Sequence, residues 1–296
     1  MKKAYLFPGQ GSQYTGMGEN HYLFNPIFKR FCDQSSEILG HDLISVMFEG
    51  PEEELKQTRN TQPAIFLHSI ALFESLKQQP DMVAGHSLGE FSALTAAKAL
   101  GFEDALRLVR KRGELMQEAG EQQKGTMAAV IGMEEADVEK ICSEAAEDTG
   151  EDVVPANYNA TGQLVISGAE TAVEKAIELL KEKGCKMAKK LPVSGAFHSS
   201  LMQPARDGLK EELDKVEIKK ADYPVYANVN AEPTNDPEVI RNNLIEQLLN
   251  PVKWTQTMQA MQNDDAGLFI EVGPGKVLQG LVKRTLGNNV KIMGYQ

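Results

Sequence analysis

One serine in the chain, Ser87, lies in a setting that suits a nucleophile. It is the centre of the stretch 85–89 (Gly-His-Ser-Leu-Gly), which follows the short apolar run 82–84 and precedes a predicted helix that ends at Leu100. This order of strand, tight turn and helix is the nucleophile-elbow pattern, in which the glycines let the backbone turn sharply. The start of the helix offers free N–H groups to a developing oxyanion. The alternative is a glycine-rich turn that only ends the strand.

A serine at its ordinary pKa is a weak nucleophile, so a general base must lie within hydrogen-bond reach of Ser87. We favour His198, because it lies in the loop of small residues 194–200, just after a predicted strand. An ordinary surface loop is the alternative. No obvious third carboxylate is placed after Ser87 in the way that α/β-hydrolases order Ser, Asp and His. We therefore expect a dyad in which a backbone carbonyl or an amide orients the histidine.

The segments that position these residues alternate between strands and helices. Apolar runs and helical periodicity predict strands at 4–7, 82–84, 224–229, 268–272 and 290–293, and helices at 26–40, 51–58, 64–77, 103–119, 201–216 and 237–249, with one further helix after Pro251 and one that ends at Leu286. Such alternation implies an α/β fold with a mostly parallel sheet covered on both faces. We expect a large α/β-hydrolase-like domain.

The pattern changes between residues 126 and 193. Strands are predicted at 126–133, 153–159, 163–167 and 185–193, and helices at 134–147 and 169–183. The order βαββαβ within about seventy residues is that of a ferredoxin-like unit. Longer α/β elements resume on both sides, so we expect a small domain, residues 125–195, inserted into a large domain of residues 1–124 and 196–296.

Two further predictions concern single side chains on helices. The helix 103–119 carries a basic run that is typical of a solvated face, but Arg112 shares a side with Leu108 and Leu115 and is the one that could point inward. His68 lies in the apolar helix 64–77, where we expect it to be buried, hydrogen-bonded and without a catalytic role. We expect His86 to brace the turn beside Ser87.

The composition narrows the classes of function. The 296 residues carry a net charge of −11, which argues against a nucleic acid or an anionic membrane as the main partner. Three scattered cysteines fit the reducing cytoplasm better than a disulfide framework. The glycines of the loop 8–13 match neither nucleotide-binding fingerprint. We expect that loop to present backbone N–H groups and the Gln10 amide to a substrate.

Eight stretches recur in this order in one family of enzymes. They are 7–13 (Phe-Pro-Gly-Gln-Gly-Ser-Gln), 60–64 (Asn-Thr-Gln-Pro-Ala), 85–90 (Gly-His-Ser-Leu-Gly-Glu), 109–113 (Val-Arg-Lys-Arg-Gly), 157–159 (Asn-Tyr-Asn) with Gly162-Gln163, 195–199 (Gly-Ala-Phe-His-Ser), Gln247 with 250–252 (Asn-Pro-Val), and 271–275 (Glu-Val-Gly-Pro-Gly). The chain resembles, over essentially its whole length, the malonyl-CoA:acyl-carrier-protein transacylases of type II bacterial fatty-acid synthesis.

The resemblance implies a set of catalytic roles. Ser87 is the acylated nucleophile, and His198 is the general base and then the general acid. The backbone N–H groups of Gln10 and Leu88 form the oxyanion hole. Gln247 lies at the site, and its backbone carbonyl orients His198.

The same resemblance implies how the acyl group is selected. Arg112 binds the free carboxylate of a malonyl group through two parallel hydrogen bonds. Phe197 is the residue type that malonyl-selective members carry, and it narrows the pocket against an α-methyl group. Asn157 and Asn159 match the strand of the small domain that lines the cleft.

The implied reaction transfers malonyl from malonyl-CoA to the phosphopantetheine thiol of acyl carrier protein, with a malonyl-serine intermediate. We expect no metal and no cofactor, because malonyl-CoA is itself the substrate, and we expect a cytoplasmic monomer. The carrier that the resemblance implies is acidic, so with a net charge of −11 we expect a local basic dock near the cleft. For each basic residue taken singly, an ordinary solvated side chain is the alternative. Candidate dock residues are Lys186, Lys189, Lys190, Lys276, Lys283 and Arg284.

Three alternatives remain at this point. The same catalyst could serve a polyketide carrier, which neighbouring genes or tests with different carriers would decide. An editing acyl hydrolase would be expected to lack the arginine at position 112. A non-catalytic module that only holds acyl groups would not need both Ser87 and His198.

Overall fold

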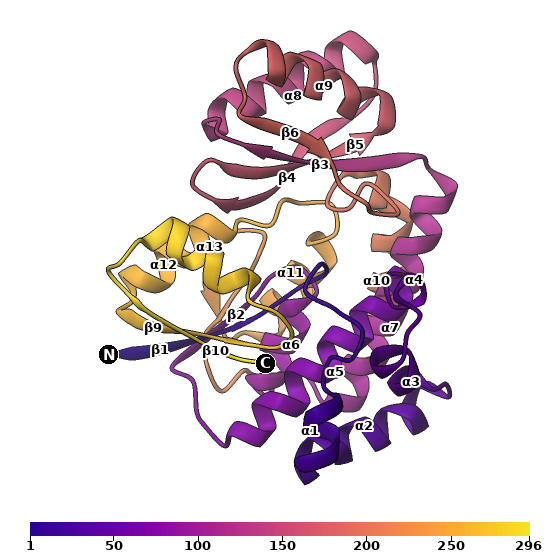
Figure 1. Cartoon of the computed structure of the whole chain (residues 1–296), viewed down its shortest axis with the longest axis vertical. Helices are drawn as coiled ribbons and strands as arrows, with labels where there is room; N and C mark the ends of the chain where they lie inside the picture. Colours follow the sequence, from indigo (N-terminus) through magenta and orange to yellow (C-terminus); the bar gives the residue numbers. More distant parts are fainter.

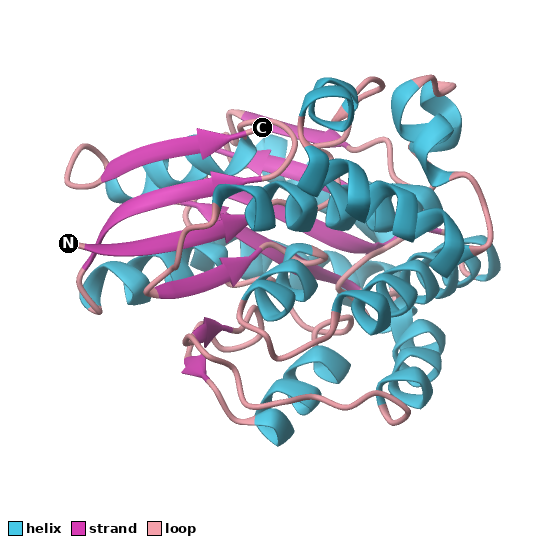
Figure 2. Cartoon of the chain, turned by 90° about the horizontal axis from the view of Figure 1, so that it is seen from below, coloured by secondary structure: helices cyan, strands magenta, loops and turns pink.

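A computed structural model describes all residues, 1–296. A six-stranded sheet, sheet A, forms the centre of the larger part (Figures 1 and 2). Its strands, in spatial order, are β10 (Lys291–Tyr295), β9 (Ala266–Val272), β1 (Lys2–Phe7), β2 (Met82–Gly85), β7 (Val225–Tyr226) and β8 (Pro233–Thr234). All neighbours are parallel except β7 and β8. The predicted mostly parallel sheet is confirmed.

Helices cover both faces of sheet A (Figure 2). The helices of the larger part, some of which pack on other helices, are α1 (Glu19–Phe24), α2 (Pro26–Leu39), α3 (Leu43–Phe48), α4 (Glu52–Leu55), α5 (Thr58–Leu76), α6 (Gly89–Ala96), α7 (Phe102–Gln122), α10 (Gln203–Leu213), α11 (Pro237–Glu246), α12 (Trp254–Asn263) and α13 (Val277–Leu286). None of the chain's helices combines the length and the apolar character that crossing a membrane requires.

The alternation of side chains along β1 divides the core in two. Tyr5 and Phe7 point into the larger core, which α2, α5, α6 and α7 share. Ala4 and Leu6 point to the other face, where they meet side chains of α12 and α13. Successive residues of a strand face opposite sides of a sheet, so a central strand buried on both faces is apolar throughout.

A second sheet, sheet B, lies in the smaller part of the molecule, above sheet A in Figure 1. Its spatial order is β4 (Val153–Ala160), β5 (Gln163–Ala169), β3 (Gly125–Ile131) and β6 (Met187–Lys190), all antiparallel. The helices α8 (Glu135–Thr149) and α9 (Glu170–Glu182) pack on one face and share a separate apolar core with it. The other face turns toward sheet A and carries side chains that line a cavity.

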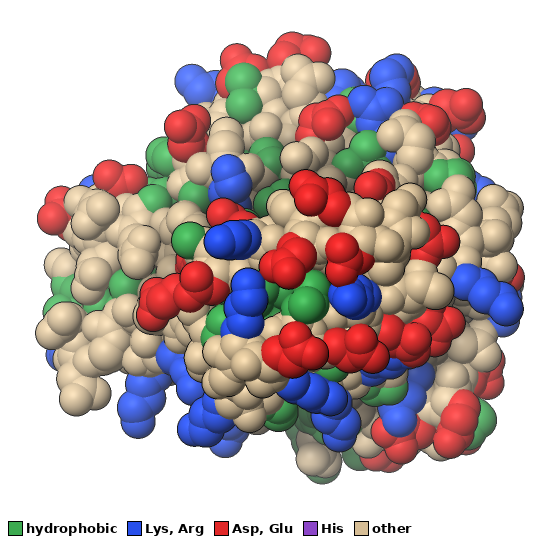
Figure 3. Space-filling model, turned by 90° about the horizontal axis from the view of Figure 1, so that it is seen from above, with side chains coloured by type: hydrophobic (Ala, Val, Ile, Leu, Met, Phe, Trp, Pro, Cys, Tyr) green, Lys and Arg blue, Asp and Glu red, His purple; other side chains and the backbone are tan.

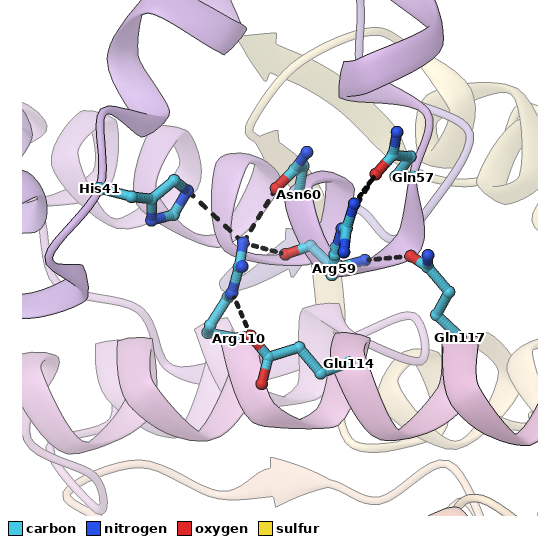
Figure 4. Close-up of polar contacts among 7 residues, drawn as sticks. All are labelled: His41, Gln57, Arg59, Asn60, Arg110, Glu114 and Gln117. Carbon is cyan, nitrogen blue, oxygen red and sulfur yellow. Dashed lines mark hydrogen bonds and ion pairs between the residues drawn. The ribbon is translucent and has the colours of Figure 1, made fainter.

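Arg110 fastens α7 to the start of α5 (Figure 4). Its guanidinium contacts Glu114 through Nε (2.7 Å) and donates through Nη1 to Asn60 Oδ1 (2.9 Å) and to the Arg59 carbonyl (3.1 Å). Pro63 lies inside α5 and has no N–H to bond the carbonyl four residues earlier, which is that of Arg59. Arg110 therefore supplies the hydrogen bond that the proline cannot.

The structure corrects several predicted elements. The helix expected at 51–58 is only one turn, α4, and α5 begins at Thr58, before the proline that was expected to open it. The strands expected at 185–193 and 224–229 are shorter, because only β6 and β7 pair with neighbours. The helix expected to end at Leu100 stops at Ala96, because Lys98 adopts φ 62°. Helices α1 and α3 were not predicted.

Candidate active site

Ser87 sits on a sharp turn between β2 and α6. Its φ is 51°, in the left-handed region that non-glycine residues rarely adopt. A Cβ atom at Gly85 would overlap the carbonyl of Gly89, and one at Gly89 would overlap the carbonyl of Phe7. Both glycines are therefore required for the turn to pack against β1. The nucleophile elbow predicted from this stretch has the backbone strain and the close packing that the pattern implies.

His198 lies beside Ser87. Its Nε2 atom is 2.9 Å from Ser87 Oγ, and its Nδ1 atom is 2.9 Å from the Gln247 backbone carbonyl. A carbonyl only accepts, so Nδ1 carries the proton and Nε2 is free to accept from the hydroxyl. Burial, helped by the nearby charge of Arg112, lowers the pKa of His198 to about 3. A neutral imidazole therefore faces the serine, and the Gln247 carbonyl accepts from Nδ1 as the carboxylate of a triad would.

Two backbone N–H groups beside Ser87 have no acceptor within the chain. They belong to Gln10, in the loop after β1, and to Leu88, directly before α6. Both residues line the same cavity as Ser87. The N-terminus of α6 adds the positive end of a helix dipole at this point. This pair has the composition of an oxyanion hole, because both free donors belong to residues that line the same cavity as Ser87.

Arg112 is turned inward, as its position on α7 predicted. Its side chain is 1% exposed, and burial lowers its pKa to about 9, so it stays charged at pH 7. Nη1 donates to Gln62 Oε1 (2.8 Å), and Nη2 donates to Gln247 Oε1 (2.8 Å) and to Ser87 Oγ (3.1 Å). Nε is buried without a partner. A buried guanidinium with an unused N–H beside the nucleophile can bind an anionic group there.

The nucleophile and its base form part of a buried amide and carboxylate network. Gln247 Nε2 donates to the Ser87 carbonyl (3.0 Å) and to Glu90 Oε2 (2.8 Å). Asn228 accepts from the Ser87 backbone N–H (2.7 Å) and donates to the carbonyl of Gly85 (2.7 Å). These bonds hold the turn from both sides, so Ser87 keeps its strained conformation.

A cavity of about 190 Å³ opens beside Ser87, between the two sheets. Phe197, Asn157 and Asn159 line it together with the dyad, as do Met127 and Val165 of sheet B. Its lining is completed by Gln10, Gln62, His86, Leu88, Arg112, Met116, Leu191 and Val193. Gln247 lies behind Arg112 and touches the dyad without lining the cavity. The cavity therefore brings together a guanidinium that can bind an acidic group, a serine hydroxyl and a wall whose exposed area is mainly apolar.

His86 joins the two parts of the molecule at the cavity. Its Nε2 atom lies 2.8 Å from Asn159 Oδ1 on β4, and its ring packs against Trp254 with centroids 5.4 Å apart. Asn157, two residues earlier on β4, pairs with Val252 in an isolated parallel bridge. These contacts fix the strand that carries both asparagines against the large part of the molecule. His86 therefore braces this junction, and its role in bracing the turn beside Ser87 stays a prediction.

Sequence reasoning missed three residues of the site and misjudged one buried residue outside it. Gln62 and Glu90 lie in two of the stretches that carry the family resemblance. Each is a polar residue among apolar neighbours, and this pattern could have indicated a buried polar side chain at the site. Asn228 follows β7, and no sequence pattern around it indicated a place in the site. The prediction for His68 was half wrong: it is buried, but neither ring nitrogen has a hydrogen-bond partner.

The α/β fold, the serine–histidine pair and the charged arginine beside it are an arrangement that can serve an enzyme that transfers an anionic acyl group. A family model described as "Acyl transferase domain" matches residues 4–295. The malonyl CoA-acyl carrier protein transacylase of Bacillus subtilis is 49% identical over 286 residues, which cover 96% of this chain and 90% of that protein.

Solved structures of malonyl transacylases are also similar to this chain. The malonyl CoA-acyl carrier protein transacylase of Coxiella burnetii has a TM-score of 0.96 and 43% identity, covering 99% of this chain and 93% of that one. A malonyl-transacylase solved in complex with its type II PKS acyl-carrier protein has a TM-score of 0.94 and 39% identity, covering 99% and 95%. The chain belongs to the acyl transferase family, and within it to the malonyl CoA-acyl carrier protein transacylases.

Proposed function

We propose that the chain transfers a malonyl group from malonyl-CoA to the phosphopantetheine thiol of acyl carrier protein through a malonyl-Ser87 intermediate. The observation that carries the proposal is the placement of the charged Arg112 within 3.1 Å of the nucleophile of a serine–histidine pair. The reaction needs no metal and no cofactor beyond the substrate.

In the first half-reaction, His198 Nε2 accepts the proton of Ser87 as Oγ attacks the thioester carbonyl. The carbonyl oxygen becomes an oxyanion that accepts from the N–H groups of Gln10 and Leu88. Collapse of this intermediate breaks the carbon–sulfur bond, and His198 returns the proton to the departing CoA sulfur. In the second half-reaction the carrier thiol gives its proton to His198 and attacks the ester, and Ser87 recovers its proton.

The malonyl carboxylate binds Arg112 in this proposal. The unused Nε–H and the Nη2–H that now contacts Ser87 Oγ form one edge of the guanidinium, and a carboxylate fits such an edge with two hydrogen bonds. When a carboxylate binds this edge, it replaces Ser87 Oγ as the acceptor of the Nη2–H hydrogen bond, so the serine hydroxyl is no longer held by Arg112. Acetyl has no carboxylate and leaves the buried charge without this partner, which favours malonyl over acetyl.

Phe197 and the two asparagines act on the rest of the acyl chain. Phe197 adjoins His198 and is 6% exposed, so its ring closes the pocket near the carbon between the two malonyl carbonyls. Asn157 and Asn159 come from sheet B and contact the substrate from the opposite side of the cleft. Asn159 is also held by His86, which limits how far the cleft can widen.

We infer a ferredoxin-like small domain at 125–195, because the β3–α8–β4–β5–α9–β6 order and its separate core are those of such a unit. Residues 1–124 and 196–296 form the α/β-hydrolase-like domain that contributes the elbow and its base. Both walls of the cleft come from one chain, so a monomer is sufficient for activity.

The carrier dock lies at the mouth of the cleft. Lys190 is bound by Glu170 and Glu174 on the α9 side of sheet B, so the alternation of side chains turns Lys189 to the cleft side. Arg284 of α13 contacts Gln163 at the start of β5 (2.7 Å). We define the dock as Lys186, Lys189, Lys276, Lys283 and Arg284, and we leave Lys190 out because its ammonium group is already paired.

The opposite surface of the small domain is unsuited to an acidic carrier. Helices α8 and α9 hold ten Asp or Glu residues and three Lys residues. Figure 3 looks onto this side and shows many acidic side chains interspersed with basic ones. Like charges repel, so the acidic carrier approaches the cleft side. The carrier belongs to fatty-acid synthesis in the main proposal; a polyketide carrier is the alternative, since the chain also resembles a transacylase of that kind.

A single assay tests the proposed function. The purified chain is mixed with malonyl-CoA in the absence of any carrier, and released CoA is measured over the first turnover. A burst of about one CoA per chain, with the mass of a malonyl group added at Ser87, is the expected result. Steady CoA release without carrier would indicate a hydrolase, and no release would indicate a module that only binds. Activity with fatty-acid and polyketide carriers then separates the two alternatives.

A further inference from the structure

Glu90 is a buried carboxylate with no cation in contact. It lies in the first turn of α6, three residues after the nucleophile, and is 2% exposed. It accepts hydrogen bonds from the Asn228 backbone N–H (3.0 Å) and from Gln247 Nε2 (2.8 Å). Both bonds go to the same oxygen, Oε2. The other oxygen, Oε1, can therefore carry a proton without the loss of either bond.

The amide of Gln247 connects this carboxylate to Arg112. Its NH₂ group donates to Glu90, and its oxygen accepts from Arg112 Nη2 (2.8 Å). A carboxylate only accepts and a guanidinium only donates, so the two groups allow a single orientation of the amide. Glu90 thereby fixes Gln247, whose backbone carbonyl also holds His198. The negative charge of Glu90 and the positive charge of Arg112 are therefore connected by the side-chain amide of Gln247, and the two charged groups do not contact each other directly.

The charged and titratable groups around Glu90 are few. Arg112 comes from α7, His198 from the loop before α10, and His86 from the elbow. The neighbouring part of α5 contributes the amide of Gln62. Burial holds the pKa of both histidines below the ordinary value, so both are neutral at pH 7. One positive charge and one negative charge therefore remain in this region.

A malonyl group disturbs that balance because it brings a second carboxylate to Arg112. Two buried negative charges would then share one positive charge, and a nearby like charge raises the pKa of a carboxyl group. Burial already raises the pKa of Glu90 to about 7. An acetyl group brings no charge and therefore leaves the pKa of Glu90 unchanged.

We propose that Glu90 is a positioning residue that takes up a proton from solvent when malonyl occupies Ser87, and releases it when malonyl leaves. The inference rests on the proposed malonyl transfer. The proton binds at Oε1, so the bonds of Glu90 to Gln247 and Asn228 persist while its charge disappears. Between the pKa values that Glu90 has in the free and in the malonylated enzyme, the site thus carries one positive and one negative charge both before and after malonylation.

This coupling has a definite pH dependence. Protonated Glu90 favours malonyl, so the equilibrium for malonylation of Ser87 weakens as pH rises through the pKa that Glu90 has in the free enzyme. Acetylation is not linked to Glu90 and lacks this fall. Substitution E90Q fixes a neutral side chain of the same shape, so malonylation of that variant should lose the dependence.

Proton uptake on acylation tests the inference directly. The chain is mixed with malonyl-CoA or acetyl-CoA in weakly buffered solution near pH 7 with an indicator dye, and protons are counted per CoA released. With the pKa of Glu90 at about 7, malonyl-CoA should consume roughly half a proton per site more than acetyl-CoA. The CoA product is the same in both reactions, so the difference reports only on the acyl group.

Two variants complete the experiment. E90Q should release CoA in a burst with malonyl-CoA but without the extra proton. E271Q is the matched control, because Glu271 is also buried but bonds the backbone N–H groups of Leu278 and Gln279 at the start of α13; it should keep the extra proton.

Equal proton uptake from both acyl-CoAs, or an extra proton that persists in E90Q, would overturn the inference. If E90Q does not fold, the comparison of the two acyl-CoAs on the unaltered chain decides it. The absence of any CoA burst from the unaltered chain would instead overturn the proposed function.

Discussion

Arg112 Nη2 donates a hydrogen bond to Ser87 Oγ across 3.1 Å. The group that would bind a carboxylate and the atom that would attack a carbonyl are therefore direct neighbours. Malonyl separates its carboxylate from its thioester carbonyl by one carbon, so both of its ends can reach these two groups at once. A longer dicarboxylic chain would have to fold back on itself in a cavity of about 190 Å³.

Ser87→Ala should abolish formation of the acyl-enzyme. The loss of turnover should be on the order of 10⁶-fold if Ser87 and His198 act as a unit, because removal of either member then removes the whole pathway. Intact-mass measurement after mixing with malonyl-CoA checks this, with Ser199→Ala as a control in the same loop as the base. A malonyl adduct on the Ser87→Ala variant would contradict the assignment of the nucleophile.

Arg112→Ala should remove malonyl transfer and leave acetyl transfer intact or improved. An unpaired malonyl carboxylate in a closed site should cost about 3–5 kcal/mol, whereas acetyl makes no use of the charge. The ratio of kcat/KM for the two acyl-CoAs measures this. Arg107→Ala, on the exposed side of the same helix, should leave the ratio unchanged. A parallel fall of both rates in Arg112→Ala would make Arg112 a structural residue.

Local patterns in the sequence predicted the nucleophile, because the elbow needs particular residues within one short stretch. The apolar strands and the βαββαβ order were predictable for the same reason: period and length are local properties. His198 was one histidine of five, and its choice over the others rested on loop composition until the resemblance was considered. The 2.9 Å contact to Ser87 spans 111 positions in the chain, and no local pattern encodes such a distance.

The network behind the dyad was beyond local reasoning. Asn228 binds the backbone of Ser87 from a loop 141 positions away, and asparagine is common in any loop. The early start of α5 was missed because Pro63 signals a helix start, while the bond that compensates it comes from Arg110 on another helix. Tertiary partners decided both features.

His68→Leu should make the protein less sensitive to acid. His68 is fully buried with no hydrogen-bond partner, and burial lowers its pKa from 6.5 to about 3. In the unfolded chain His68 therefore binds a proton near pH 6.5, whereas in the folded chain it stays neutral until about pH 3. The free energy of unfolding falls as pH drops below 6.5. At pH 5 this amounts to about 2 kcal/mol.

Chemical unfolding between pH 7 and pH 5 measures this effect. The difference in unfolding free energy between His68→Leu and the unaltered chain should move in favour of the variant by about 2 kcal/mol over that range. His41→Leu is the comparison, because His41 is only partly buried and its pKa is lowered in part by Arg110. A difference that stays constant with pH would show that His68 does not couple to acid unfolding.

Phe197→Ala should widen the pocket toward methylmalonyl. A pocket wall discriminates against one methyl group by only about 1–3 kcal/mol, so the ratio of methylmalonyl to malonyl transfer should rise by roughly 5- to 150-fold. Phe197 is also part of the large core, so some loss of stability is expected and must be measured alongside. Competition between the two acyl-CoAs gives the ratio independently of the amount of folded enzyme. An unchanged ratio would exclude Phe197 as a specificity residue.

Reversal of charge at the dock should weaken the carrier without affecting malonyl-CoA. In the double variant Lys189→Glu with Lys283→Glu, the free energy of carrier binding should weaken by about 1–2 kcal/mol, because two attractive contacts become repulsive. The KM for the carrier should therefore rise roughly 5- to 30-fold. The double variant Lys215→Glu with Lys219→Glu has the same net charge at exposed positions after α10 and should behave like the unaltered chain. The effect should shrink with added salt, because exposed charges are screened. Equal rises in KM for the carrier and malonyl-CoA would place these lysines in the substrate channel and contradict a dock.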